Sequence, residues 1–203
     1  MKKKIILITV LLVLSNGLFA RGFYNGNFQL TGGYNANELV KKSDQSHMVR
    51  MDAFNFGMET WHTFGLPLFL EAGFMFDIDF GAGTSNMVYY DNDLSMNIYG
   101  LFGPAIAINI LEIVKFNIGF GPNFEGNINF SDNLNLFAFG LGFGFNIQAN
   151  FLPISPVSPI IGYKFAVIQE EMVYEYIENE FDINSTSILS FKNEVYLGIS
   201  FNW

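Results

Sequence analysis

Apolar side chains alternate with small or polar ones along most of this chain, and this two-residue period restricts its fold more than any other feature. Residues 68–81 carry apolar side chains at every second position, namely Leu68, Leu70, Ala72, Phe74, Phe76, Ile78 and Phe80. A period of two is typical of a β-strand with one apolar face, whereas a helix repeats every 3.6 residues. Because a shift of one residue would exchange the two faces, the pattern also specifies the strand register.

The alternation recurs in eight segments, each longer than the roughly five or six residues of an average strand. The predicted segments are residues 22–34, 49–63, 68–81, 94–108, 113–126, 135–151, 160–173 and 186–203. A tilted strand crosses a membrane with about 9–11 residues. Short or proline-rich connections alternate with longer polar ones, which is typical of outer-membrane barrels. The sequence therefore predicts an all-β fold, an eight-stranded antiparallel up-and-down transmembrane β-barrel with both of its ends on the short-turn side.

The N-terminus has the regions of a secretory signal peptide. Three lysines at residues 2–4 precede an apolar run over residues 5–14, and Ala20 stands at a cleavage position. The apolar run is too short to span a bilayer well. We expect residues 1–20 to be a cleaved signal peptide and residues 21–203 to be one outer-membrane barrel domain. An uncleaved membrane anchor is the alternative.

The composition favours an exterior in contact with lipid. Charged residues make up 14% of the chain, compared with about 25% in ordinary soluble domains. So few charges would cover the surface of a soluble protein poorly. A secreted, soluble lipocalin-like ligand binder, with its phenylalanines inside, is the alternative fold. The chain has no cysteine, which excludes disulfides and thiolate metal sites. Its acidic balance argues against a nucleic-acid partner.

The last predicted strand ends on an aromatic residue at the C-terminus. Its apolar face carries Val195, Leu197, Ile199, Phe201 and Trp203. Such an ending resembles the C-terminal assembly signal of bacterial outer-membrane barrels. With the chain length and the number of strands, it resembles the small eight-stranded barrels of the OmpX- and OmpW-like group. The resemblance implies the bacterial outer membrane as location, outer-membrane lipid around the barrel, and the barrel assembly machinery as a partner. No functional residue carries over, because no family motif matches.

Three glycines, Gly140, Gly142 and Gly144, alternate with apolar residues in one segment. Their spacing differs from the G-x-G-x-x-G motif of a dinucleotide-binding loop, which opens a helix. On the inner face of a small barrel, glycines leave space for long side chains of neighbouring strands. We therefore expect an architectural role for them. A ligand cavity lined by these glycines is the alternative.

Charged residues recur on the predicted inner faces. They are Glu59, Glu71, Lys115, Glu125, Lys164, Lys192 and Glu194. Buried charges need partners, so we expect an ion-pair and hydrogen-bond network that fills the lumen. Counting from the short turns predicts Lys192 and Glu194 near mid-height, and the lower half of the barrel for Glu59, Glu71, Lys115 and Lys164. A narrow cation-selective path is the alternative.

Polar residues outside the barrel core suggest further sites. One longer connection contains the residues that a lipid-modifying enzyme would need at the rim, namely Ser43, Asp44, Ser46 and His47, although a solvated loop is the simpler interpretation. Another connection, predicted as a long loop, contains six acidic residues from Glu170 to Asp182, which could bind Ca²⁺ or an extracellular partner. A barrel hairpin that continues above the membrane is the alternative for this stretch. His62, beside Trp61 and Phe64, is predicted to belong to an interfacial aromatic belt.

Taken as a whole, the residues favour a structural or surface-interaction role, such as envelope integrity, adhesion or partner binding through long extracellular loops. A narrow channel or transporter for ions or small apolar molecules is the second hypothesis. A rim-located lipid-modifying enzyme is the third. The sequence predicts no catalytic residue, cofactor or metal site, and it makes no prediction of an oligomeric state.

Overall fold

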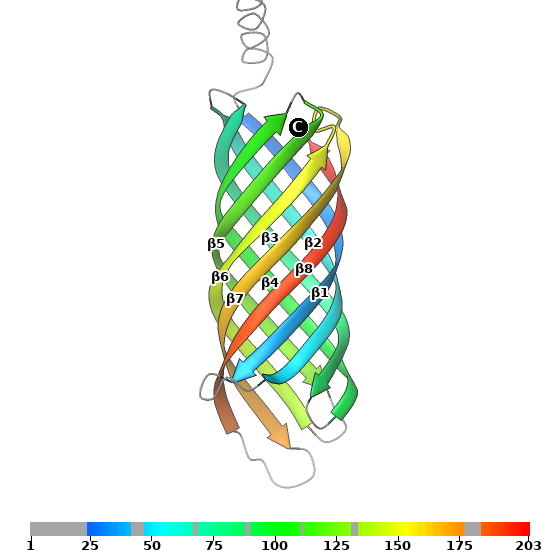
Figure 1. Cartoon of the computed structure of the whole chain (residues 1–203), viewed down its shortest axis with the longest axis vertical. Coiled ribbons are helices and arrows are strands. Elements are labelled where there is room, and N and C mark those ends of the chain that lie inside the picture. The colour runs from blue at the N-terminus through cyan, green and yellow to red at the C-terminus, as the bar shows by residue number, and fades with distance from the viewer. Residues whose placement is uncertain are drawn as a thin grey trace, which may run out of the picture.

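A computed structural model describes residues 24–41, 47–66, 69–87, 90–110, 112–130, 134–176 and 184–203. They form eight strands, β1 (Tyr24–Lys41), β2 (His47–Gly65), β3 (Leu70–Met87), β4 (Tyr90–Ile110), β5 (Val114–Phe130), β6 (Leu134–Phe151), β7 (Val157–Tyr176) and β8 (Asn184–Asn202). Each strand pairs antiparallel with its neighbour in sequence, and β1 pairs with β8 to close the barrel (Figure 1). The predicted eight-stranded antiparallel up-and-down barrel is therefore confirmed.

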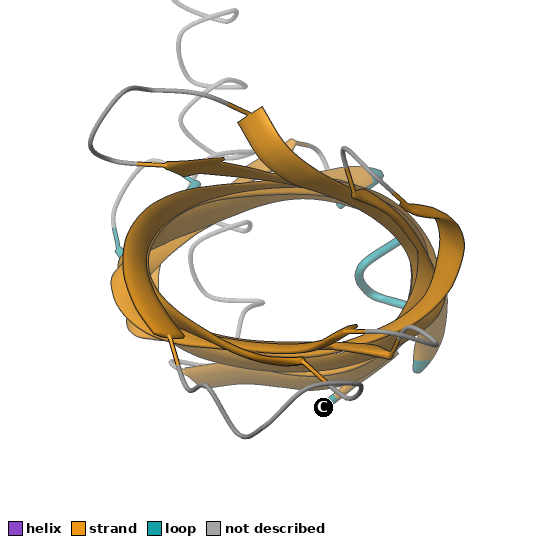
Figure 2. Ribbon diagram, turned by 90° about the horizontal axis from the view of Figure 1, so that it is seen from below, coloured by secondary structure: helices purple, strands orange, loops and turns teal. Residues whose placement is uncertain are grey.

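The strands are staggered around the barrel. A path from Thr31 across the paired residues of successive strands returns to β1 at Lys41 rather than at Thr31. Such a stagger requires the strands to tilt relative to the barrel axis, and Figure 1 shows this tilt. Viewed from one end, the strands form a continuous ring (Figure 2). Among the described residues, no helix is long and apolar enough to cross a membrane.

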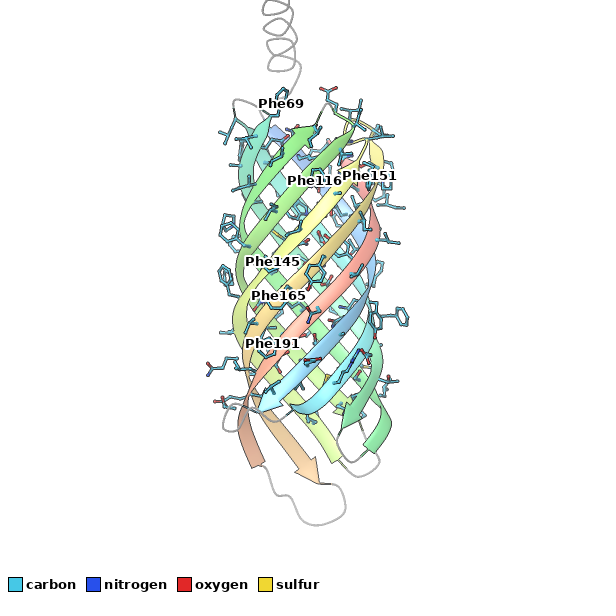
Figure 3. The ribbon with its side chains drawn as sticks, in the orientation of Figure 1. Phe69, Phe116, Phe145, Phe151, Phe165 and Phe191 are labelled. Carbon is cyan, nitrogen blue, oxygen red and sulfur yellow. The ribbon has the colours of Figure 1, made fainter. Side chains whose placement is uncertain are left out.

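Compared with a soluble barrel, the two faces have inverted polarity, with apolar side chains outside and polar ones inside. Side-chain exposure alternates residue by residue, as along β5. Large apolar side chains project outward around the barrel (Figure 3), and Phe54 and Leu141 are 75% and 67% exposed. The buried inner face is instead rich in asparagine, carboxylates and lysines. The soluble alternative, with its phenylalanines inside, is therefore wrong, because this exterior needs an apolar surrounding.

The strands extend further than predicted at the end with the long connections. β3 and β4 reach Met87 and Tyr90, and β7 continues to Tyr176. Glu170 and Glu171 therefore belong to a strand, as the predicted segment 160–173 and the hairpin interpretation have it, and the long-loop interpretation of these two residues is wrong. The backbone hydrogen bonds of a hairpin can continue whatever the polarity of its side chains, so the loss of the apolar pattern did not mark the strand ends. Glu175 also lies in β7. Residues 177–183, which contain Glu178, Glu180, Asp182 and Phe181, lie outside the described residues.

The C-terminus lies at the end with the short turns (Figure 1), as predicted. The backbones of Gly26 and Trp203 exchange two hydrogen bonds there, of 3.1 and 3.0 Å. Among the described residues of the three short turns, Phe69, Glu112 and Leu152 have a positive φ. A left-handed residue reverses the chain within few residues. This geometry keeps one end of the barrel compact.

The glycines of β6 face the lumen, and atoms of other strands occupy the space where their side chains would lie. A Cβ at Gly140 would lie 2.5 Å from Cγ of Glu170, and one at Gly144 would lie 2.8 Å from Oη of Tyr99. A Cβ at Gly142 would collide with the carbonyl oxygen of Val167. The space that the glycines leave is thus occupied by long side chains and by the adjacent backbone.

Substitution of Gly142 tests this packing. Gly142→Ala should lower the free energy of unfolding by about 1–3 kcal/mol, because the methyl group can be placed only if the backbone of β7 moves. Urea unfolding of the barrel refolded into detergent micelles measures the change. Gly65→Ala is the matched control, since a Cβ at Gly65 would meet nothing within 4 Å. Equal midpoints for the two variants would contradict the tight approach of β6 and β7.

Candidate functional site

The lumen contains all seven charged residues that the sequence predicted there. Their exposed fractions are at most 6%. The strands that position them are spread around the barrel, with Glu59 on β2, Glu71 on β3, Lys115 and Glu125 on β5, Lys164 on β7, and Lys192 and Glu194 on β8. The structure does not bring them into one cluster. It divides them into three groups along the barrel.

The central group is built around Lys164. Its Nζ lies 3.0 Å from Oε1 of Glu59, 2.9 Å from Oδ1 of Asp77 and 2.8 Å from Oδ1 of Asp79. The ring of Tyr196 lies beneath it, 4.8 Å from Nζ to the centroid, which adds a cation–π contact. One ammonium therefore has three carboxylates and an aromatic face around it, all inside the barrel.

Lys192 extends the central group towards β8. Its Nζ lies 3.2 Å from Oε2 of Glu194 and 3.9 Å from Oδ2 of Asp79, and it stands over the ring of Tyr99 at 4.2 Å. Asn55 donates a hydrogen bond of 2.6 Å to Glu194. Asp79 thus joins the two lysines. The central group contains four carboxylates and only two ammonium groups.

The sequence contained a signal for two residues that the predicted network omitted. Asp77 and Asp79 follow Glu71 on the same strand face, and Asp77 pairs in register with Glu59. Their contact with Lys164 depends on β7, which lies across the lumen from β3 (Figure 1). Alternation can place a residue inside the barrel, but it cannot identify a partner on a distant strand.

Aromatic residues inside the lumen were also missed. Trp61 is 1% exposed and donates its indole N–H to Glu59 at 3.1 Å, so the aromatic belt predicted at His62 does not include this neighbour. The alternation itself puts Trp61 on the face of Glu59. His62 does lie on the outer face, where it stacks on Phe74 with ring centroids 4.9 Å apart and forms a hydrogen bond with the hydroxyl of Tyr24.

A second group lies at the short-turn end. Nζ of Lys115 is 2.6 Å from Oε2 of Glu71, and Thr63 contacts both groups, through hydrogen bonds of 2.5 Å to Glu71 and 3.3 Å from Lys115. This pair borders a cavity of about 280 Å³, whose other walls include Asn25, Asn27, Asn109 and Asn202. Ammonium, carboxylate and amide groups therefore surround the lumen at its short-turn end.

The third group lies towards the long connections and consists of two acids. Glu125 accepts hydrogen bonds from Asn37 at 2.5 Å and Ser190 at 3.1 Å. Glu170 accepts one from Asn127 at 3.2 Å and contacts Glu125 carboxyl to carboxyl. Neither acid makes an ion pair with a lysine or arginine within the described residues. Glu170 is fully buried, so the prediction that it belongs to a solvated acidic loop is wrong.

An apolar cluster follows the acid pair. Its members are Leu39, Met51, Leu136, Ala138 and Ile188. Leu39 and Ile188 lie one inward position beyond Asn37 and Ser190 on the same strands, in the direction of the long connections. The lumen therefore has four successive regions. From the short turns to the long connections they are a polar cavity, the central ion-pair group, the acid pair and the apolar cluster.

Other predicted residues have different positions. The five apolar residues proposed as an assembly signal all face outward, with exposed fractions between 39% and 62%, namely Val195, Leu197, Ile199, Phe201 and Trp203. The candidate enzyme residues Ser43, Asp44 and Ser46 lie outside the described residues, as does the side chain of His47. Within the described part of the chain, no group of three or more His, Cys, Asp or Glu residues could hold a metal ion.

Removal of the Lys164 ammonium tests the central group. Lys164→Met should lower the free energy of unfolding by about 3–5 kcal/mol, because it leaves three buried carboxylates without their shared cation. Arg50→Met is the control, since Arg50 forms an exposed ion pair with Asp52 at 3.3 Å and such pairs contribute about 0–1 kcal/mol. Unfolding midpoints in urea measure both. A loss for Lys164→Met no larger than that for Arg50→Met would refute the shared-cation arrangement.

Neutral substitution in the acid pair should not lower the stability of the barrel, in contrast to Lys164→Met. Glu170→Gln should leave the unfolding midpoint unchanged or raise it, because the amide keeps the volume of Glu170 and removes one of two acids in direct contact, which cannot favourably ionise together. Glu71→Gln should lower the midpoint, because it removes the carboxylate that pairs with Lys115. Both variants are compared in the same urea titration, and the reverse order would contradict the assignment of these two groups.

Comparisons with known proteins support the fold. No family model matches the chain, and no curated protein matches it. The outer-membrane protein OprG of Pseudomonas aeruginosa is similar in structure, with a TM-score of 0.58 and 8% identity over 90% of this chain and 98% of that one. Neisserial surface protein A is also similar, with a TM-score of 0.50 and 11% identity over 86% of this chain and 96% of that one. In its fold and its apolar exterior, the chain is similar to these small bacterial outer-membrane β-barrels.

Proposed function

We propose that this chain is a non-conducting outer-membrane barrel with a structural or surface-interaction role in the cell envelope. The observation that carries the proposal is the filled lumen, where Lys164 and three carboxylates from β2 and β3 meet across the interior. An eight-stranded barrel has an interior just wide enough for side chains to fill. The charged lumen residues then act as a structural core, which ties opposite walls of the barrel together.

Surface interaction in this proposal occurs at the end with the long connections. Strands β7 and β8 extend furthest there (Figure 1), and Glu38 and Glu171 are exposed on the strands near that end. Strand hairpins present side chains more rigidly than flexible loops do, which lowers the entropic cost of binding. The acidic character of this rim suits a partner with a basic surface.

Biogenesis in this proposal follows the general route for outer-membrane barrels. Residues 1–20 act as the cleaved signal peptide, and the alternating residues from Val195 to Trp203 act as the signal for the barrel assembly machinery. The exposure of these apolar side chains on the last strand supports the proposal, because an assembly factor can reach them while β8 is still unpaired.

A narrow cation path is the second candidate, and one observation favours it. The central group has more carboxylates than ammonium groups, namely Glu59, Asp77, Asp79 and Glu194 against Lys164 and Lys192. A lumen of this charge would attract cations and exclude anions. The side chains that cross the interior are the argument against conduction.

Planar-bilayer recordings distinguish the two candidates. We expect no channel events from the wild-type barrel, because the ion-pair group and the apolar cluster occupy the lumen. Lys164→Ala removes the central ammonium and should admit cations, whereas Arg50→Ala, on the outer face, should stay silent. Steady cation-selective conductance of the wild-type protein that changes in Lys192→Ala would replace the structural proposal with the channel.

A further inference from the structure

The outer surface of the barrel has an apolar groove over β3 to β6. Its volume is about 550 Å³, and its walls include Phe80, Met96, Ile98, Ile128, Phe137 and Phe139. These side chains belong to the outward-facing positions of their strands. The groove therefore lies on the lipid-facing side and is separate from the lumen.

An outward-facing glycine makes this groove. Gly126 has no side chain to fill the space between β4 and β6, and a Cβ there would lie 3.1 Å from Cγ2 of Ile98 and 3.6 Å from Cδ2 of Phe139. In register, Gly126 pairs with Ile98 on one side and Phe139 on the other. A larger residue at this position would fill the floor of the groove.

Outward-facing charges show how deep the groove lies in the membrane. Among the strand side chains that the structure describes, those charges are Glu38, Arg50, Asp52 and Glu171, and all lie towards the long connections. Charged groups on the lipid face of a barrel are tolerated near the interface and costly at the bilayer centre. Phe80, by contrast, lies midway along β3. The groove thus runs from the hydrocarbon region towards the long connections, where the outer-leaflet head groups lie.

Glu171 lies at the end of the groove nearest the long connections. It is exposed and pairs in register with Phe139, next to Gly126. Within the described residues it makes no ion pair with a lysine or arginine. An apolar groove that continues the lipid-facing surface and ends at a carboxylate is complementary to a lipid with a positively charged head group.

We propose that this groove is a specific lipid site, which binds one acyl chain of an outer-leaflet lipid whose head group carries a primary amine. The acyl chain lies over Gly126 between the aromatic walls, and the ammonium of the head group pairs with Glu171. This site is independent of whether the lumen conducts, because its walls are on the opposite face of the strands.

Native mass spectrometry of the full-length processed barrel tests the proposal. The barrel in detergent is titrated with phosphatidylethanolamine and, separately, with phosphatidylglycerol of the same acyl chains. We expect one phosphatidylethanolamine to be retained, with at least five-fold tighter binding than phosphatidylglycerol. Gly126→Leu should weaken its retention ten-fold or more. Gly32→Leu is the matched control, since Gly32 also faces outward and a Cβ there would meet only the carbonyl oxygen of Asn55, at 4.0 Å.

Two further variants separate the head group from the chain. Glu171→Gln should abolish the preference for phosphatidylethanolamine and leave retention of the acyl chain. Met96→Trp fills the groove from its wall without touching the strand backbone, so it replaces Gly126→Leu if that variant does not migrate as a folded, heat-modifiable barrel. Retention that is equal in wild type, Met96→Trp and Gly126→Leu would overturn the site. A head-group preference that persists in Glu171→Gln would overturn the role of the carboxylate.

Discussion

Closure of the backbone hydrogen-bond network is the constraint on which the rest of this structure depends. Lipid offers no hydrogen-bond partners, so every strand needs a neighbour on both sides. β1 and β8 meet this need for each other along their length, from the pair Asn27–Asn202 to the pair Lys41–Ile188. Once the ring is closed, the alternation of side chains assigns every second residue to lipid and the others to a narrow interior. The polarity inversion follows from this geometry.

The interior then resolves an electrostatic problem. Lysines and carboxylates removed from water are costly unless they meet opposite charges and hydrogen bonds. Lys164 meets three carboxylates, and Glu59 also accepts hydrogen bonds from Trp61 and Asn146. Asparagine amides donate further hydrogen bonds to these acids, from Asn37 to Glu125, from Asn55 to Glu194 and from Asn146 to Glu59. Glycines on β6 provide the volume that these longer side chains need.

The sequence was sufficient for the fold and for the face of almost every residue. Alternation predicted the strands, the closed architecture and the burial of Lys164 and Glu194. It failed where backbone pairing continues after the apolar alternation has ended, as in β7, which extends to Tyr176 and thus past the predicted end at residue 173. It also could not predict which residues meet across the lumen. That depends on the stagger by which β1 and β8 join, which is a property of the closed ring and is not encoded in any single strand.

The interior contacts also have a consequence for the order of events in folding. Asn55 and Glu194 are 139 residues apart in sequence, and Lys164 and Asp77 are 87 apart. No hairpin alone contains such a pair, so the interior charges stay exposed to water until the last strand docks. Contacts of long sequence separation slow folding. Desolvation of the charges and ring closure are therefore a single late step, and a half-assembled barrel would remain hydrated at its core.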